Sequence, residues 1–178
     1  PRIELDFEEI ALYKSEKTSI FTAEKLLPKR SVEHWNADIT DSKSQAVLLE
    51  KLAAYSDYKK VVLIEGVFFF LTEAQIDAVL SFCSDLLNPG DILMCVSFDE
   101  SQKETAVFKR LIHYFADVLK SADNPFSTLP HSYYKQLDGF KLIKQSSSWE
   151  LGQKLEVIPH DLKVREVLNE HFYILERK

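Results

Sequence analysis

Residues 61–66 constrain the fold of this chain more than any other segment. They read VVLIEG, an apolar run followed by a carboxylate and a glycine. A run rich in β-branched residues is typical of a central parallel strand that is covered on both faces. In open α/β sheets, ligands bind just beyond the carboxyl ends of the strands. We therefore expect Glu65 and Gly66 to lie at a ligand-binding edge of a sheet.

Strand and helix patterns alternate along the chain. The predicted strands are residues 2–6, 32–39, 60–64 and 91–98, and the predicted helices are residues 7–27, 42–55, 72–87 and 102–120. Two late strands are predicted at 140–144, with an extension to 149 left open, and at 172–177. This order favours an α/β fold with a mainly parallel sheet and an antiparallel edge. We expect the first four strands to run parallel and residues 172–177 to run antiparallel to them.

The composition excludes some classes of partner. The net charge is -6 and the sequence pI is near 5.4, so neither a nucleic-acid backbone nor an anionic membrane is the expected partner. Cys83 and Cys95 lie in apolar surroundings and are predicted to be reduced core residues of a cytoplasmic protein. No membrane span is expected, because Glu65 interrupts the longest apolar run. We expect one domain over residues 1–178.

Three carboxylates follow predicted strands at their carboxyl ends: Asp6, Asp38 and Glu65. Parallel strands would bring these ends to one edge of the sheet. A carboxylate accepts hydrogen bonds, and a nucleoside offers matching donors in its ribose hydroxyls and its adenine amine. The alternative is that such residues only solvate strand ends, and that Glu65 forms an ion pair with a nearby lysine.

Three sequence blocks resemble one enzyme family. IELDFEEIALYK, NADITD and LIEGVFFFLTEAQIDAVL are similar to successive blocks of the leucine carboxyl methyltransferase and polyketide O-methyltransferase-like family. That resemblance implies a Rossmann-like class I methyltransferase sheet and S-adenosylmethionine as the cofactor. The late segments NPFSTLPHSYYKQLDGFKLI and HFYILERK also resemble the last strands of the family, so the resemblance covers most of the chain.

The resemblance implies a role for each matched residue. Asp6 would hold the ribose hydroxyls. Asp38 would accept a hydrogen bond from the adenine amine, and the backbone N–H of Ile39 would face a ring nitrogen. Glu65, with Gly66 beside it, would lie near the methionine end of the cofactor.

The chain departs from the family pattern at two places. Phe70 stands where the family has a tyrosine, so a hydroxyl is missing there. The chain has four glycines, none in G-x-G spacing, and no counterpart of the family's glycine-rich loop or of its upstream arginine. We expect that the chain is the C-terminal portion of the family's domain, that a partner chain supplies the missing strand, or that the cofactor site is lost.

Other residue patterns favour simpler interpretations. The five histidines show no metal-ligand spacing with one another or with the cysteines, so no metal is expected. Tyr133, Tyr134 and Trp149 fit either a substrate pocket or helix packing, and packing is favoured.

The resemblance thus implies an S-adenosylmethionine-dependent O-methyltransferase, or its C-terminal portion, that acts on a carboxyl or hydroxyl group of a small molecule or peptide. The sequence is also compatible with a homo-oligomer or with the presence of a partner chain. Two rival hypotheses remain. One is a non-catalytic methyltransferase-like binding module, and the other is a Rossmann oxidoreductase, which the missing glycine fingerprint disfavours.

Overall fold

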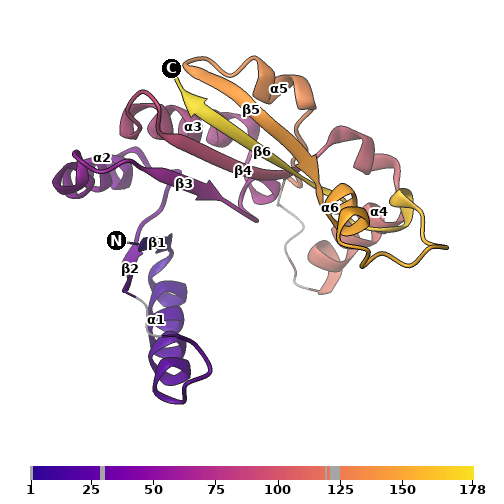
Figure 1. The fold of residues 1–178 in the computed structure, drawn as a ribbon, viewed down its shortest axis with the longest axis horizontal. Coiled ribbons are helices and arrows are strands. Elements are labelled where there is room, and N and C mark those ends of the chain that lie inside the picture. The colour runs from indigo at the N-terminus through magenta and orange to yellow at the C-terminus, as the bar shows by residue number, and fades with distance from the viewer. Residues whose placement is uncertain (1, 29–30, 119, 121–124) are drawn as a thin grey trace. The chain divides into compact units, whose positions relative to one another are not determined.

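The computed structural model describes the whole chain except residues 1, 29–30, 119 and 121–124. It contains two compact units, Pro1–Asp57 and Tyr58–Lys178 (Figure 1). The expectation of a single domain over residues 1–178 stays a prediction.

The first unit is built on two parallel strands. Its elements are β1 (Arg2–Asp6), α1 (Glu8–Ala23), β2 (Val32–Asn36), α2 (Ser42–Leu52) and a 3-10 turn at Ala53–Tyr55. Arg2 pairs with Val32 and Asp6 with Asn36, which confirms that these two strands run parallel. The strand predicted for residues 32–39 ends earlier, at Asn36, because the chain beyond it turns toward α2.

The second unit holds a four-stranded mixed sheet of order β3-β4-β6-β5. Its regular elements are β3 (Val61–Ile64), α3 (Glu73–Leu86), β4 (Ile92–Phe98), α4 (Ala106–His113), α5 (His131–Lys135), β5 (Phe140–Ser147), α6 (Ser148–Lys154) and β6 (Glu170–Arg177). β3 and β4 run parallel, and β6 runs antiparallel to both β4 and β5. The α/β class with parallel pairs and an antiparallel edge is confirmed, although the parallel pairs β1–β2 and β3–β4 form two separate ladders.

One face of the second sheet carries the most deeply buried residues. Leu93 and Cys95 on β4 pair with Leu175 and Tyr173 on β6, and all four are at most 1% exposed. The apolar stripe of α3 supplies further buried side chains: Ile76, Val79, Leu80, Phe82 and Cys83. The two cysteines are buried and free, as predicted. Thr72 and Gln75 form a capping box at the start of α3.

The opposite face holds an aromatic cluster near the carboxyl end of β4. Phe69, Phe98 and Phe108 form its buried centre, with Phe69 edge-to-face against both other rings at 5.6 and 5.8 Å. Partly buried residues pack around it: Phe70, Leu111, Ile112, Phe115 and Phe126. Phe68–Phe70 forms a 3-10 turn between β3 and α3, so this aromatic run belongs to the protein interior.

The expectation that β3 is a central strand covered on both faces is wrong for this sheet. β3 lies at its edge, and Val61 and Leu63 are 63% and 54% exposed. Only Ile64 is buried. The β-branched run does specify a strand, but burial depends on which elements cover it, and that information is not local to the run.

The helix predicted for residues 102–120 is divided. A 3-10 turn occupies Glu100–Glu104, α4 begins after Thr105, and a π-helical turn follows at Tyr114–Val118. The Thr105 hydroxyl donates to the Gln102 carbonyl and accepts from the Phe108 backbone N–H, so it ends the first turn and caps the next. Residue 119 lies outside the described part of the chain.

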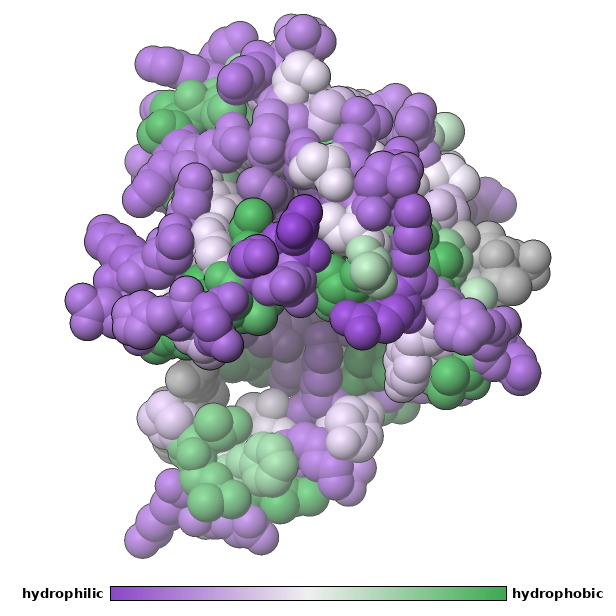
Figure 2. Space-filling view, turned by 90° about the vertical axis from the view of Figure 1, so that its right-hand side faces the viewer, coloured by the Kyte–Doolittle hydropathy of each residue, from purple (hydrophilic) through white to green (hydrophobic). Residues whose placement is uncertain are grey.

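The surface mixes hydrophilic and apolar side chains. Figure 2 shows one face on which hydrophilic residues predominate and apolar residues gather in patches between them. Among the described residues, no helix is both long and apolar enough to cross a membrane.

Candidate functional site

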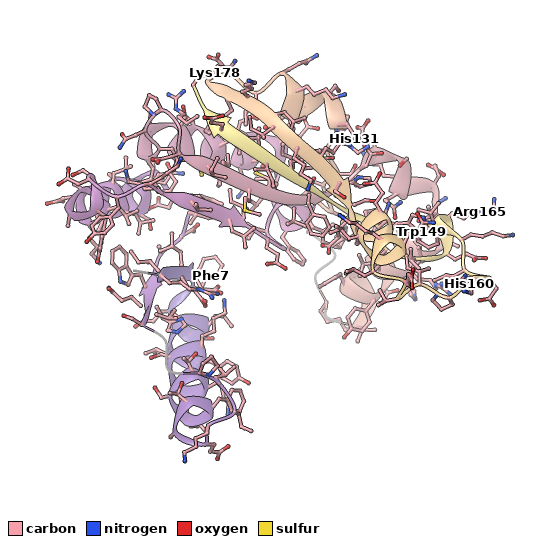
Figure 3. The ribbon with its side chains drawn as sticks, in the orientation of Figure 1. Phe7, His131, Trp149, His160, Arg165 and Lys178 are labelled. Carbon is pink, nitrogen blue, oxygen red and sulfur yellow. The ribbon has the colours of Figure 1, made fainter. Side chains whose placement is uncertain are left out.

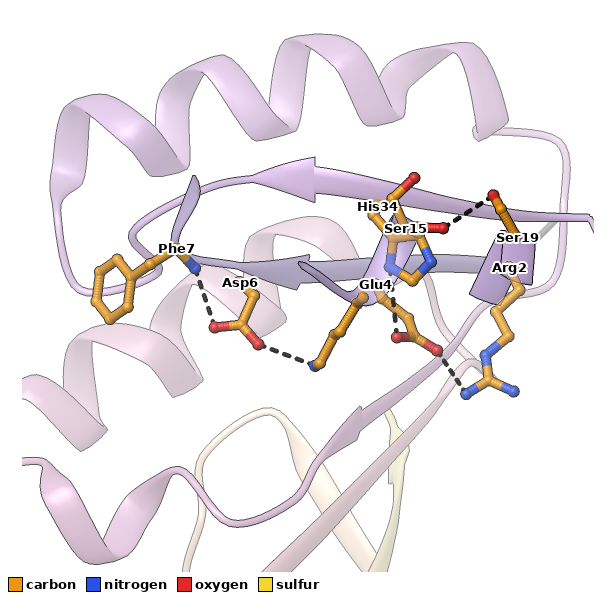
Figure 4. A network of polar contacts seen from close by, with 8 residues as sticks. Arg2, Glu4, Asp6, Phe7, Ser15, Ser19 and His34 are labelled. Carbon is orange, nitrogen blue, oxygen red and sulfur yellow. Dashed lines mark hydrogen bonds and ion pairs between the residues drawn. The ribbon is translucent and has the colours of Figure 1, made fainter. Parts of the chain in front are cut away.

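Asp6 ends β1 and is already engaged in two contacts. Its Oδ1 accepts a hydrogen bond from the Phe7 backbone N–H at 3.0 Å, and its Oδ2 accepts one from Lys14 Nζ at 2.9 Å (Figure 4). The Lys14 ion pair is partly exposed to solvent on both sides. Solvent screens such a pair, so a ligand hydroxyl can compete with it at small cost.

Asp38 lies two residues beyond β2, next to the end of β1. The Ala37 backbone N–H donates to the Asp6 carbonyl at 2.9 Å, which holds the two strand ends together. Asp38 Oδ1 accepts from the Thr40 backbone N–H and from the Thr40 hydroxyl, at 2.8 and 2.7 Å. Its Oδ2 has no hydrogen-bond partner among the described residues. The sheet therefore brings Asp6 and Asp38 to the same edge, with one carboxylate oxygen of Asp38 available.

Ile39 and Asp41 complete this loop. The Ile39 carbonyl accepts a hydrogen bond from Gln45 Nε2 at 2.7 Å. Asp41 is the N-cap of α2 and accepts from the Ser44 backbone N–H at 2.8 Å. Asp41 thus caps a helix, whereas the Asp38 carboxylate bonds only to Thr40 of this loop among the described residues.

Glu65 and Gly66 follow β3 in the second unit, and both are exposed. Gly66 has a φ of +68°, and a Cβ atom placed on it would meet nothing within 4 Å. The alternative that Glu65 forms an ion pair with a lysine is not observed within the described residues. Its carboxylate is available at the end of the strand.

An apolar pocket of about 260 Å³ opens beside Gly66. Its lining comes from the aromatic cluster and from two later segments: Gly66, Phe69, Phe70, Phe98, Leu111, Phe115, Leu168 and Glu170. Glu170 is the only charged residue of that lining and is half-buried. Burial raises the pKa of its carboxyl, and the charge of Glu65 raises the pKa further. The pocket therefore joins a hydrophobic wall to one carboxylate, that of Glu170, whose pKa is raised by the charge of Glu65.

A larger cavity, of about 380 Å³, lies between α1 and β2. Hydroxyl groups and small side chains line most of it: Ser15, Thr18, Ser19, Thr22, Ala23, Val32 and His34. Neither ring nitrogen of His34 has a hydrogen-bond partner in the described structure, although Nδ1 lies 3.6 Å from Glu4 Oε2 (Figure 4). None of the predicted site residues lines this cavity, so we do not assign the cofactor to it.

A polar network connects α5 with β6 and β4. His131 Nδ1 lies 2.6 Å from the Tyr173 hydroxyl and 3.0 Å from Gln145 Nε2, and its Nε2 lies 3.4 Å from Asp99 Oδ2. Figure 3 shows His131 at the start of α5. With the proton on Nε2, the ring donates toward Asp99 and its Nδ1 accepts from the Tyr173 hydroxyl, so this network holds α5 in place. No group of three or more potential metal ligands occurs among the described residues.

None of Tyr133, Tyr134 and Trp149 lines either of the two pockets described above. Tyr134 is buried, stacks on Tyr173 at 3.7 Å and donates its hydroxyl to Ser97 at 2.8 Å, so it packs. Sequence reasoning missed Glu170 as a site residue, because it precedes the apolar pattern of β6. The signal that could have identified it is its register, since Glu170 pairs directly with Phe98 at the end of β4.

Comparisons with known proteins agree on the fold. The sequence matches no family model and no curated protein. A candidate methyltransferase from Thermobifida fusca aligns over 99% of this chain and 62% of its own, with a TM-score of 0.68 and 15% identity. A DUF574-family protein from Streptomyces avermitilis aligns over 99% and 64%, with a TM-score of 0.63 and 12% identity.

A third similar structure contains a bound ligand. Magnesium protoporphyrin IX methyltransferase from Synechocystis, solved with S-adenosylhomocysteine, aligns over 99% of this chain and 64% of its own, with a TM-score of 0.56 and 9% identity. At these identities the likeness shows the fold alone. The chain spans less than two thirds of the length of each of these three structures.

Proposed function

We propose that this chain is the larger part of an S-adenosylmethionine-dependent O-methyltransferase of the leucine carboxyl methyltransferase and polyketide O-methyltransferase-like group. The observation that carries the proposal is the placement of Asp6 and Asp38 at one edge of parallel strands in a methyltransferase-like fold. The resemblance of the three sequence blocks also supports it.

The residues fit the cofactor chemically. Asp6 would accept from the ribose hydroxyls, and the unpartnered Oδ2 of Asp38 would accept from the adenine amine beside the Ile39 backbone N–H. Glu65 and Gly66 would lie near the methionine end, where a glycine leaves space for a ligand. These assignments rest on the sequence resemblance and on the availability of the acceptor atoms.

Methyl transfer from this cofactor requires few catalytic groups on the protein. The cofactor supplies an activated methyl group, so the chain must align an acceptor oxygen with it and exclude water. The scarcity of catalytic motifs in the sequence agrees with this. The acceptor would belong to a small molecule or peptide, the setting would be cytoplasmic, and a second copy or a partner chain could complete the cofactor site.

The test is cofactor affinity in the polypeptide encoded by the complete reading frame. Asp38→Ala removes an acceptor from the adenine amine, which costs about 1–3 kcal/mol, or roughly a ten- to hundredfold loss of S-adenosylhomocysteine affinity by calorimetry. Asp41→Ala is the matched control, because it removes a helix cap from the same loop and should leave cofactor affinity unchanged.

Two outcomes would contradict the proposal. Equal affinity in the Asp38→Ala and unmutated proteins, both shown to be folded, would refute the adenine assignment. A complete polypeptide that binds no S-adenosylhomocysteine would instead favour the non-catalytic module.

A further inference from the structure

The pocket beside Gly66 can distinguish between the two acceptor classes left open above. We infer that this pocket binds an aromatic or similarly apolar acceptor that carries a neutral hydroxyl group, and that Glu170 receives the proton of that hydroxyl. This inference rests on the proposed function for its methyl-transfer step, but the binding preference is a property of the second unit alone.

The pocket wall selects an apolar ring. Phe69, Phe70, Phe98 and Phe115 line it, and aromatic side chains favour edge-to-face contact with another ring. A cavity of about 150 Å³ is enough to hold benzene. The 260 Å³ found here therefore accommodates one substituted ring. Gly66 leaves the pocket open on its side, because no side chain projects from that position.

The charges at the pocket select against a carboxylate acceptor. Glu170 lines the pocket and Glu65 is near enough to perturb it, and neither side chain has an ion-pair partner within the described residues. A carboxylate ligand would bring a third negative charge to this pair, and like charges in a partly desolvated site repel. A hydroxyl group instead donates a hydrogen bond to Glu170. The position of Glu170 opposite Phe98 in the ladder directs both side chains to the same face.

Glu170 is also suited to accept a proton. Its burial beside Glu65 raises the pKa of the carboxyl above that of an exposed glutamate, which makes it a stronger base. In the transfer step, the acceptor oxygen forms a bond to the methyl carbon while the carbon–sulfur bond breaks and its electron pair stays on sulfur. The hydroxyl proton passes to Glu170, which later releases it to water. A carboxylate acceptor would need no such base.

Two probes that share the same methyl-substituted ring test the preference without the cofactor. 4-Methylphenol stays neutral at pH 7, since a phenol has a pKa of about 10, whereas 4-methylbenzoate is charged. Their affinities for the 178-residue chain are measured by amide chemical-shift titration. We expect 4-methylphenol to bind about tenfold more tightly, with shifts at the pocket residues. Equal or tighter binding of 4-methylbenzoate, or no binding of 4-methylphenol at millimolar concentration, would overturn the inference.

Variants of Glu170 and Glu176 identify which charge causes the preference for 4-methylphenol. Glu170→Gln removes the charge and should bring the two affinities to within about threefold of each other. Glu176→Gln is the matched control, because Glu176 lies on the same face of β6 at its other end. An unchanged preference in a folded Glu170→Gln protein would refute the role of Glu170. Failure of S-adenosylhomocysteine binding in the complete polypeptide would refute the proposed function and leave this result standing, so the two failures are distinguishable.

Discussion

Replacing Asp91 should destabilise the second unit more than any other single carboxylate change that we consider. Asp91 precedes β4 and is 4% exposed. Its Oδ1 accepts from the Lys60 backbone N–H and its Oδ2 from the Asn88 backbone N–H, each at 2.9 Å. The Lys60 ammonium lies 3.8 Å from Oδ2. The Asp91 carbonyl also accepts from the Arg177 backbone N–H, so this residue joins the starts of β3 and β4 to the end of β6.

The expected loss in the free energy of unfolding follows from the backbone N–H groups that bond to the Asp91 carboxylate. Asp91→Ala removes the carboxylate acceptor of two part-buried backbone N–H groups, at about 1–3 kcal/mol each. The change also removes the cost of burying a carboxylate, so we expect a net loss of about 2–4 kcal/mol in the free energy of unfolding. Asp91→Asn keeps one acceptor oxygen but points an amide N–H toward the second donor, so it should cost about half as much.

Urea denaturation followed by circular dichroism measures this loss. With a slope of about 2 kcal/mol per molar urea, Asp91→Ala should lower the midpoint of the second unit by about 1–2 M. Asp85→Ala is the control, because Asp85 is exposed in the last turn of α3, and it should change stability by less than about 0.5 kcal/mol. If Asp91→Ala shifted the midpoint no more than Asp85→Ala, the reasoning about the buried donors would be refuted.

Three further predictions concern binding and stability. The chain as printed lacks a glycine-rich loop, so it should bind S-adenosylhomocysteine poorly, and low-micromolar affinity by calorimetry would contradict this. Tyr134→Phe removes the donor to the buried Ser97 hydroxyl and should cost about 0.5–1.5 kcal/mol in urea denaturation; an unchanged midpoint would argue against that bond. Burial and the neighbouring His131 lower the pKa of His171, while Asp99 and Glu150 oppose the shift. The unfolded state then binds the proton more readily, so stability should fall as the pH drops from about 8 to 5.5, and less so in His171→Gln. Identical pH dependence in both proteins would contradict it.

The local patterns predicted most elements, because strands and helices here follow hydrophobic periodicity and capping residues. α3 shows this best, with Thr72 as its cap and an apolar stripe facing the core. The division of the helix predicted for residues 102–120 was not predicted, since it depends on how Thr105 bonds to Gln102 once the chain is folded. The edge position of β3 was missed for a related reason, because strand order is a property of the whole sheet.

The candidate site was predicted in part. The sequence placed Asp6 and Asp38 after parallel strands, and the β1–β2 ladder confirms their common edge. The roles assigned to them, and to Ile39, Glu65 and Gly66, stay predictions. Glu170 could not be found from local sequence, because its proximity to Phe98 and Glu65 arises only when β6 pairs with β4.

The position of β6 has a consequence for how the second unit acquires its structure. β6 is the last strand in chain order, yet it lies between β4 and β5. Phe98 pairs with Glu170 and Ile92 with Glu176, so the central ladder joins segments that are distant in sequence. Such long-range pairing is intrinsically slow. Until β6 inserts, β4 and β5 each present a bare edge that another chain could extend. The last strand in chain order thus completes this sheet from its middle, because both β4 and β5 need β6 to pair their facing edges.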